Sequence, residues 1–210
     1  MTRTTNARIT GFTFLLYIAA GVGSMAGLSR NALANVTLSL LMCFSALTLG
    51  VTLYAITRDE DRDIAMFGLA CRVAEGVLGA AFMPIRLALP AVGASASTAS
   101  EAQAALDAIL TSARGSNILV SAIFFAAGST AFCWLLLRGR MIPSLLAWLG
   151  VLASVLLVIS LPLQLARVID GGFATFVWLP MAVFEVAFAL WLIARGSSLP
   201  AVKPPFQSAE

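Results

Sequence analysis

The stretch "GLACRVAEGVLGAAF", residues 68–82, places an arginine and a glutamate inside an apolar run. Arg72 and Glu75 are three residues apart, so on a helix they share one face. A charge at the centre of a membrane costs at least about 2.5–3.5 kcal/mol on insertion scales, and such side chains turn toward the interior of a helix bundle. The stretch therefore predicts a membrane helix whose polar face lies inside a bundle.

The composition of the whole chain supports a membrane setting. The chain has 210 residues, of which 60% are hydrophobic and 11% charged, and its mean hydropathy is +0.96. A soluble domain carries about 25% charged residues. The net charge of +3 is small and the basic residues are scattered, which favours a role in membrane topology over nucleic-acid binding.

Six apolar stretches are long enough to cross a bilayer, which takes roughly 20 residues of helix. They lie near residues 10–28, 36–56, 64–86, 118–137, 142–166 and 173–194. We therefore predict an all-α membrane protein with one six-span transmembrane domain over 1–195. The polar, proline-containing segment 196–210 is expected to be a disordered cytoplasmic tail. Because the first apolar run is longer than the usual 7–15 residues of a signal-peptide core, we interpret it as a span.

The connection between the third and fourth spans has a pattern of its own. Thr98 and Glu101 have the spacing of a capping box, and apolar residues follow at helical intervals. We predict a short amphipathic helix over 98–114 on the outer side. A partly ordered loop is the alternative.

Orientation follows from the Lys and Arg residues. With a cytoplasmic N-terminus, eight of them fall on the inner side: Arg3, Arg8, Arg58, Arg62, Arg138, Arg140, Arg195 and Lys203. The outer side holds four: Arg30, Arg86, Arg114 and Arg167. This bias predicts that both termini are cytoplasmic and that the protein resides in the plasma membrane. The topology also permits a three-plus-three inverted arrangement, as in transporters, although the two halves show no convincing similarity.

Several kinds of active site are disfavoured by the residue types present. The chain has no histidine, which removes the usual zinc, haem and Ser–His arrangements. Its three cysteines lie in apolar runs and have no CxxC spacing. We predict no catalytic residue, no metal site and no cofactor.

A third deep charge, Glu185, lies in the sixth span at nearly the same depth as Arg72 and Glu75. We expect Arg72 to bridge Glu185 while Glu75 stands beside them. Two carboxylates face one guanidinium, so one carboxyl is expected to keep its proton, and Glu75 is the chosen one. Tyr17 in the first span is expected to join this cluster, and Ser129 and Thr130 lie at a similar depth.

Three interpretations of the cluster stay open. In the first interpretation the cluster is a midplane site that binds or moves a small ligand, a lipid headgroup or a proton. In a second interpretation the protein is a structural or accessory subunit, and its charges only fix helix packing. An intramembrane enzyme acting on lipid or quinone is the least favoured. The expected partners are the bilayer and a lipid or small-molecule ligand, and the oligomeric state is left open.

Several segments together resemble a known membrane family. They are "ARITG", "TLYAI", "CRVAEG", "LLRGRMIPSLLAWLGVL" and "FEVAFALWLIARG", in this order along the chain. Their order and spacing are similar to the family called domain of unknown function 4386. The resemblance implies a six-span prokaryotic membrane protein in which Arg72, Glu75 and Glu185 match family positions. It implies no activity.

Overall fold

The computed structural model describes residues 2–26, 32–84, 101–169 and 171–196, and these residues form helices and turns without any strand. Six long helices follow one another in the described ranges: α1 (Arg3–Met25), α2 (Ala32–Thr57), α3 (Arg62–Ala81), α5 (Glu101–Arg138), α6 (Ser144–Leu165) and α7 (Gly171–Arg195). Each is long and apolar enough to cross a membrane. The prediction of an all-α, multi-pass membrane protein is confirmed. The predicted tail, apart from Gly196, lies outside the described residues.

Capping residues explain where two helices begin. The side-chain oxygen of Thr2 accepts a hydrogen bond from the backbone N–H of Thr5 at 3.2 Å, so α1 begins seven residues before the predicted span. Asp61 likewise accepts hydrogen bonds from the N–H groups of Asp63 and Ile64. Both caps satisfy amide donors that have no partner in the first turn. The helices therefore extend past the purely apolar segments.

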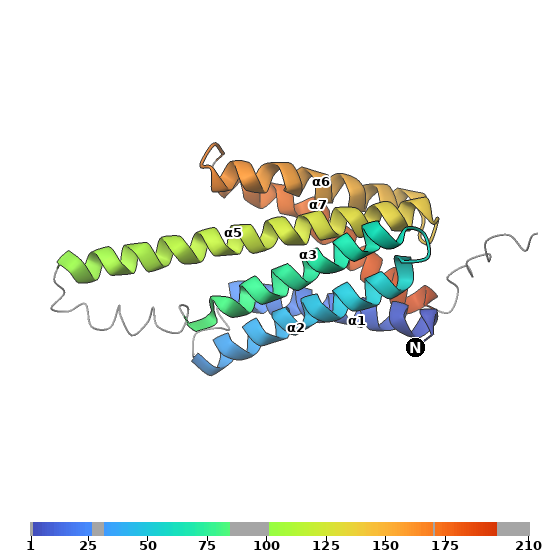
Figure 1. The fold of residues 1–210 in the computed structure, drawn as a ribbon, viewed down its shortest axis with the longest axis horizontal. Helices are drawn as coiled ribbons and strands as arrows, with labels where there is room; N and C mark the ends of the chain where they lie inside the picture. Colours follow the sequence, from blue (N-terminus) through green and yellow to red (C-terminus); the bar gives the residue numbers. More distant parts are fainter. Residues whose placement is uncertain (1, 27–31, 85–100, 170, 197–210) are drawn as a thin grey trace, which may run out of the picture.

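Helix α5 differs most from the prediction. Instead of an amphipathic helix over 98–114 and a separate span over 118–137, α5 is one continuous helix of 38 residues. Residues 101–116 contain several alanines, the best helix former, and no proline, so nothing ends the helix before the apolar run. At 1.5 Å per residue, α5 is about 57 Å long, and Figure 1 shows it projecting beyond its neighbours.

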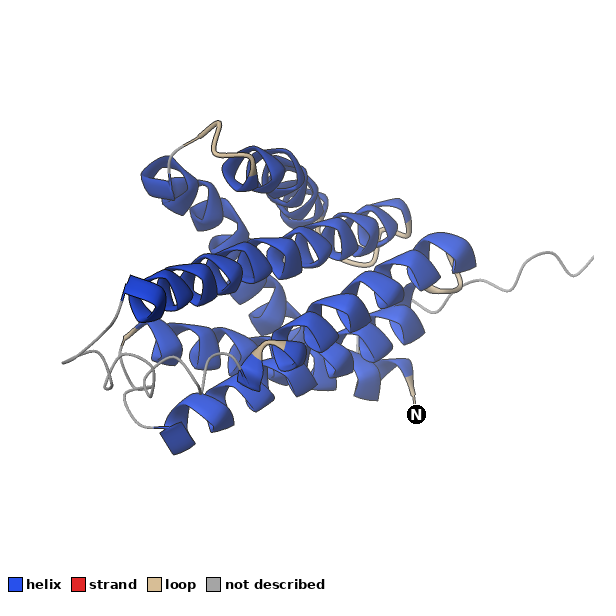
Figure 2. Cartoon of the chain, turned by 60° about the vertical axis from the view of Figure 1, so that its left-hand side comes forward, coloured by secondary structure: helices blue, strands red, loops and turns tan. Residues whose placement is uncertain are grey.

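The helices pack as a ring that follows their order in the chain. Each contacts the preceding and the following helix, and α7 closes the ring by packing against α1. Gly196, directly after α7, lies against the side chain of Arg8 on α1, so the two ends of the described chain share one end of the bundle. We call this the termini end, and the other the opposite end (Figures 1 and 2).

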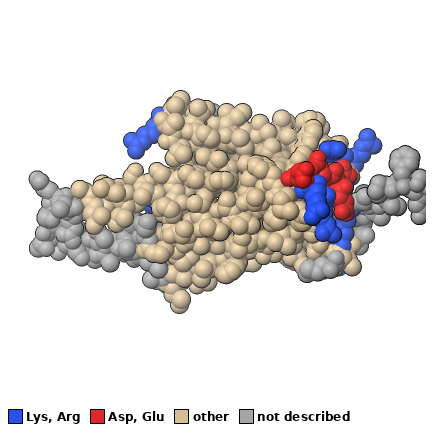
Figure 3. Space-filling model, in the orientation of Figure 1, with Lys and Arg blue, Asp and Glu red and all other residues tan. Residues whose placement is uncertain are grey.

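The surface and interior of the bundle have the polarity expected in lipid. Leu145 is 84% exposed and Phe176 is 74% exposed, whereas Arg72 is only 1% exposed. Figure 3 shows acidic and basic side chains gathered at the termini end, over the turns between α2 and α3 and between α5 and α6. There Arg138 pairs with Asp61 at 3.5 Å. An apolar belt with charges at its end is the arrangement expected of a membrane helix bundle, and an arginine within a span is expected to face the interior.

Candidate functional site

Arg72 lies at the centre of the ring, on the inward face of α3. Its guanidinium is 4.6 Å from the ring centroid of Phe125 and 5.8 Å from that of Phe14. The rings supply cation–π contacts where water is excluded. Gly50 on α2 leaves room for the stem of the arginine, because a Cβ atom there would lie 2.9 Å from the Cβ of Arg72. Small residues and aromatic faces together accommodate a large buried cation.

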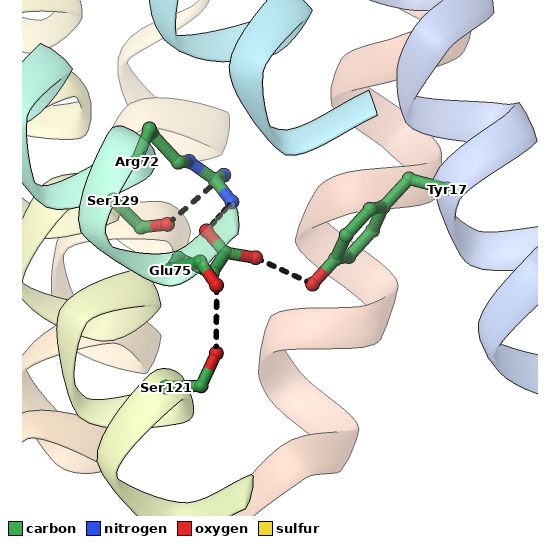
Figure 4. Close-up of polar contacts among 5 residues, drawn as sticks. All are labelled: Tyr17, Arg72, Glu75, Ser121 and Ser129. Carbon is green, nitrogen blue, oxygen red and sulfur yellow. Dashed lines mark hydrogen bonds and ion pairs between the residues drawn. The ribbon is translucent and has the colours of Figure 1, made fainter. Parts of the chain in front are cut away.

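The guanidinium pairs with a carboxylate of its own helix. Arg72 Nη1 donates to Glu75 Oε2 at 2.9 Å, and Nη2 donates to Ser129 Oγ on α5 at 3.4 Å. The spacing of three residues on α3 turns both charged side chains to the same side, as the sequence predicts. The ion pair is therefore formed within one helix (Figure 4).

Glu75 is also bound by two other helices. Tyr17 on α1 donates its hydroxyl proton to Glu75 Oε1 at 2.7 Å. Ser121 on α5 donates to the backbone carbonyl of Glu75 at 3.2 Å. Figure 4 shows these groups converging from α1, α3 and α5. Both carboxylate oxygens of Glu75 are thus hydrogen bonded, which is the condition for keeping a charge in low dielectric.

Glu185 on α7 is placed differently. It lies ten residues before Arg195 and Arg72 lies ten residues after Arg62, so each is about 15 Å from the termini end. Its side chain is buried, and Oε1 has no hydrogen-bond partner. Among the described residues, no ion pair or hydrogen bond joins Arg72 to Glu185. The expected bridge between Arg72 on α3 and Glu185 on α7 is therefore wrong. The two residues lie at nearly the same depth, as expected, but Arg72 has another partner.

This correction also reverses the roles expected of the two glutamates. Glu75, expected to stand beside the bridge, is the residue that pairs with Arg72. Glu185, expected to be the ion-pair partner, is the one with an unsatisfied oxygen. The Nε of Arg72 is also buried without an acceptor. The physical reason is that Glu75 is already adjacent to Arg72, whereas bridging to Glu185 needs a particular rotation of a second helix.

A small cavity adjoins the arginine. It measures about 10 Å³ and is lined by Arg72 and Ser129 among apolar side chains, including Phe14, Phe132 and Phe188. A volume of this size holds about one water molecule. Within the described ranges, no group of three or more His, Cys, Asp or Glu residues is arranged to hold a metal ion.

Sequence reasoning placed some of the neighbouring polar groups and missed others. Ser129 joins the cluster, while Thr130 donates to the carbonyl of Ala126 in its own helix. Ser121 was missed, although its spacing carried a signal. Ser121, Phe125 and Ser129 are four residues apart and form one face of α5. Once Ser129 is placed beside Arg72, the other two follow.

Comparison with known proteins places the chain in a family. No curated protein and no solved structure matches the chain. The family model described as "Domain of unknown function (DUF4386)" matches residues 20–196, which include every charged member of the cluster. The resemblance seen in the sequence is confirmed, and the chain belongs to the DUF4386 family.

Proposed function

We propose that this protein is a non-enzymatic membrane protein that moves a proton through the cluster of Arg72, Glu75, Glu185 and Tyr17. The observation that carries the proposal is the buried, unpartnered carboxyl oxygen of Glu185 at nearly the same level of the bundle as the Arg72–Glu75 ion pair. An isolated ionised carboxylate in low dielectric is far less stable than the neutral acid. With Glu75 balancing Arg72, the cluster is neutral only when Glu185 holds a proton.

The geometry suggests how such a proton could be released. Glu185 gives its proton to a water molecule that reaches it, and the new carboxylate is attracted by the nearby guanidinium. Arg72 then faces two carboxylates in place of one, and its Nε–H still lacks an acceptor. Taking up a proton restores the arrangement described above. The proton is thus exchanged at one carboxyl, while the arginine offsets the transient negative charge.

Two observations favour a proton over a larger ligand or a purely structural pair. The cavity beside Arg72 has room for about one water molecule, which is too small for a lipid headgroup. A charge pair that only fixed helix packing would be expected to join two helices, whereas Arg72 and Glu75 share α3. The hydrogen bonds from Tyr17 to Glu75 and from Arg72 to Ser129 do connect α1 and α5 to α3, and they favour the accessory-subunit alternative. That alternative leaves Glu185 without a role.

Charge distribution supports an orientation for this function. We infer that the termini end faces the cytoplasm and that the membrane is the plasma membrane. Among the described residues, the termini end carries Arg3, Arg8, Arg58, Arg62, Arg138, Arg140 and Arg195, and the opposite end carries Arg114 and Arg167. Cytoplasmic loops are enriched in such residues. The three-plus-three inverted arrangement stays a prediction.

Proton flux into proteoliposomes tests the proposal. Purified protein is reconstituted into vesicles with a trapped pH dye, and a potassium diffusion potential drives proton entry. We expect flux above that of protein-free vesicles, and a loss of at least about tenfold in Glu185→Gln, which cannot titrate. Glu60→Gln, the same change in the α2–α3 turn, is the matched control and should keep the parent flux. A parent protein no faster than empty vesicles, or an active Glu185→Gln, would contradict the proposal and leave the accessory-subunit reading.

A further inference from the structure

The two ends of the bundle offer the cluster very different surroundings. Between the cluster and the termini end lie Leu53, Phe132, Leu136 and Phe188, each no more than 2% exposed. Counted from the helix ends, they occupy roughly the 3–11 Å next to the termini end. We call these four residues the apolar layer. All four also line the small cavity beside Arg72, so this cavity lies between the apolar layer and the cluster. Apart from Arg72, Ser129 and the weakly polar thiol of Cys133, its lining offers no hydrogen-bond partner to a water molecule.

Hydroxyl groups near the apolar layer do not bridge it. Thr10 donates to the carbonyl of Asn6, and Thr52 donates to that of Thr48. The hydroxyl oxygens of Thr10 and Thr52 also lie 2.8 Å apart, and because Thr10 has one hydroxyl proton, this contact and its bond to Asn6 are alternatives. No hydrogen bond among the described residues links these threonines to Arg72 or Glu75. These hydroxyls therefore provide no hydrogen-bonded path across the apolar layer.

Polar groups continue from the cluster toward the opposite end. Tyr17 and Ser121 contact Glu75 directly and are only half-buried. Asn117, one turn beyond Ser121 on α5, is half-buried and donates from Nδ2 to the carbonyl of Leu78 at 3.3 Å. Ser121 and Asn117 lie about 26 and 32 Å from the termini end, whereas Glu75 lies about 20 Å from it. The polar side chains thus extend outward from the cluster in one direction.

We infer that in this conformation water reaches the cluster from the opposite end, along Asn117, Ser121 and Tyr17, while the apolar layer closes the termini end. Only the identity of the travelling species, a proton, rests on the proposed function; the path itself rests on side-chain placement. Given the orientation proposed above, the proton enters from the non-cytoplasmic side.

The placement of the titratable groups around Glu185 is consistent with access of water from one end of the bundle. Tyr17 comes from α1, Arg72 and Glu75 come from α3, and Cys133 comes from α5. Residues 144–165, which form α6, contain no titratable side chain. Apart from Cys133, which lines the apolar cavity, these groups lie at the level of Glu185 or closer to the opposite end. Cys133 lies at the level of the apolar layer but makes no hydrogen bond to Glu185 or Arg72, so no hydrogen-bonded relay among the described residues leads from Glu185 through that layer.

Thiol labelling in sealed vesicles tests this path without requiring any proton flux. The reagent is a membrane-impermeant methanethiosulfonate, which reacts with a thiolate and therefore reports water at the site. One variant carries Ser121→Cys with Cys43, Cys71 and Cys133 replaced by Ala. Its control keeps the native Cys133 as the only cysteine, at the level of the apolar layer. Right-side-out and inside-out vesicles present each end in turn.

We expect Ser121→Cys to react at least about tenfold faster from the opposite end than from the termini end, and Cys133 to react from neither within the same time. Asn117→Cys is a second variant, in case Ser121→Cys folds poorly, and should react fastest of all. Labelling of Cys133 from the termini end would overturn the inference, and so would a failure of both Ser121→Cys and Asn117→Cys to react from the opposite end. A missing proton flux with the expected labelling would reject the proposed function alone.

Discussion

The helices pack more closely at the termini end of the bundle than at the opposite end. Toward the termini end, a Cβ atom added at Gly11, Gly68 or Gly150 would approach neighbouring atoms to 2.8, 2.9 and 2.6 Å. Toward the opposite end, a Cβ at Gly79 would lie 3.1 Å from the Sγ of Cys43, one at Gly21 would meet nothing closer than 3.9 Å, and one at Gly115 nothing within 4 Å. Close helix contact at small residues is a main source of cohesion in membranes.

This difference in packing separates the half of the bundle that holds the charged cluster in place from the half through which water is proposed to reach it. The tightly packed end fixes α1, α3, α5 and α7 around Arg72, so that the guanidinium and Glu75 keep one geometry. The more open end contributes the half-buried Tyr17, Ser121 and Asn117. A rigid half can support a charged cluster, while a looser half can admit water to it.

The largest effect is expected from removing the arginine. Arg72→Met leaves Glu75 buried without its partner, which typically destabilises a protein by about 3–5 kcal/mol. Thermal unfolding in detergent, followed by tryptophan fluorescence, should show this loss. The double variant Arg72→Met with Glu75→Leu removes both charges of the pair and should recover most of the stability.

The matched control for this experiment uses the other glutamate. Arg72→Met with Glu185→Leu still leaves Glu75 stranded, so it should be no more stable than Arg72→Met alone. If the Glu185→Leu double variant recovered and the Glu75→Leu one did not, the bridge between α3 and α7 expected from the sequence would be the real pair.

A smaller effect should follow from adding one methyl group to the tightly packed end. In Gly11→Ala the new Cβ would lie 2.8 Å from the carbonyl oxygen of Ala189 and from the Cγ1 of Ile193, so α1 and α7 must move apart. Overpacking of this kind destabilises by about 1–3 kcal/mol. Gly115→Ala, where the methyl group meets open space, should lose no stability because alanine is the better helix former. Equal melting temperatures for the two variants would contradict the difference in packing between the two ends of the bundle.

Much of this architecture could be predicted from the sequence because hydropathy and helical rise are strong signals. The six membrane-crossing helices and the shared depth of Arg72, Glu75 and Glu185 follow from them. Tyr17 was correctly placed near Glu75 because it lies at the same level in α1. The sequence did not indicate that α5 is continuous, because apolar residues mark the part of a helix inside the membrane and not where the helix begins. Residues 101–116 are less apolar but keep a high helical propensity.

Choosing between the two glutamates required three-dimensional information. Depth gives the height of a side chain in the bundle but not the direction in which its helix faces. Arg72 and Glu75 share a helix, so their relative direction is fixed by the spacing of three residues. For Glu185, the rotation of α7 about its own axis decides the contact. That rotation depends on packing such as that of Gly150 against Phe184, which no pattern in the sequence indicates.

Infrared difference spectroscopy tests the central claim, that Glu75 holds the arginine while Glu185 holds a proton. At neutral pH we expect a carbonyl band of a protonated carboxyl in the parent protein. Shortening a side chain by one methylene changes the carbonyl frequency while keeping the acid, so Glu→Asp variants identify the owner of the band. Glu→Gln would be ambiguous, because the remaining carboxyl can change its protonation when its neighbour is neutralised. The account predicts that Glu185→Asp shifts the band and that Glu75→Asp leaves it in place. A band that shifts in Glu75→Asp alone, or that is absent from the parent, would contradict it.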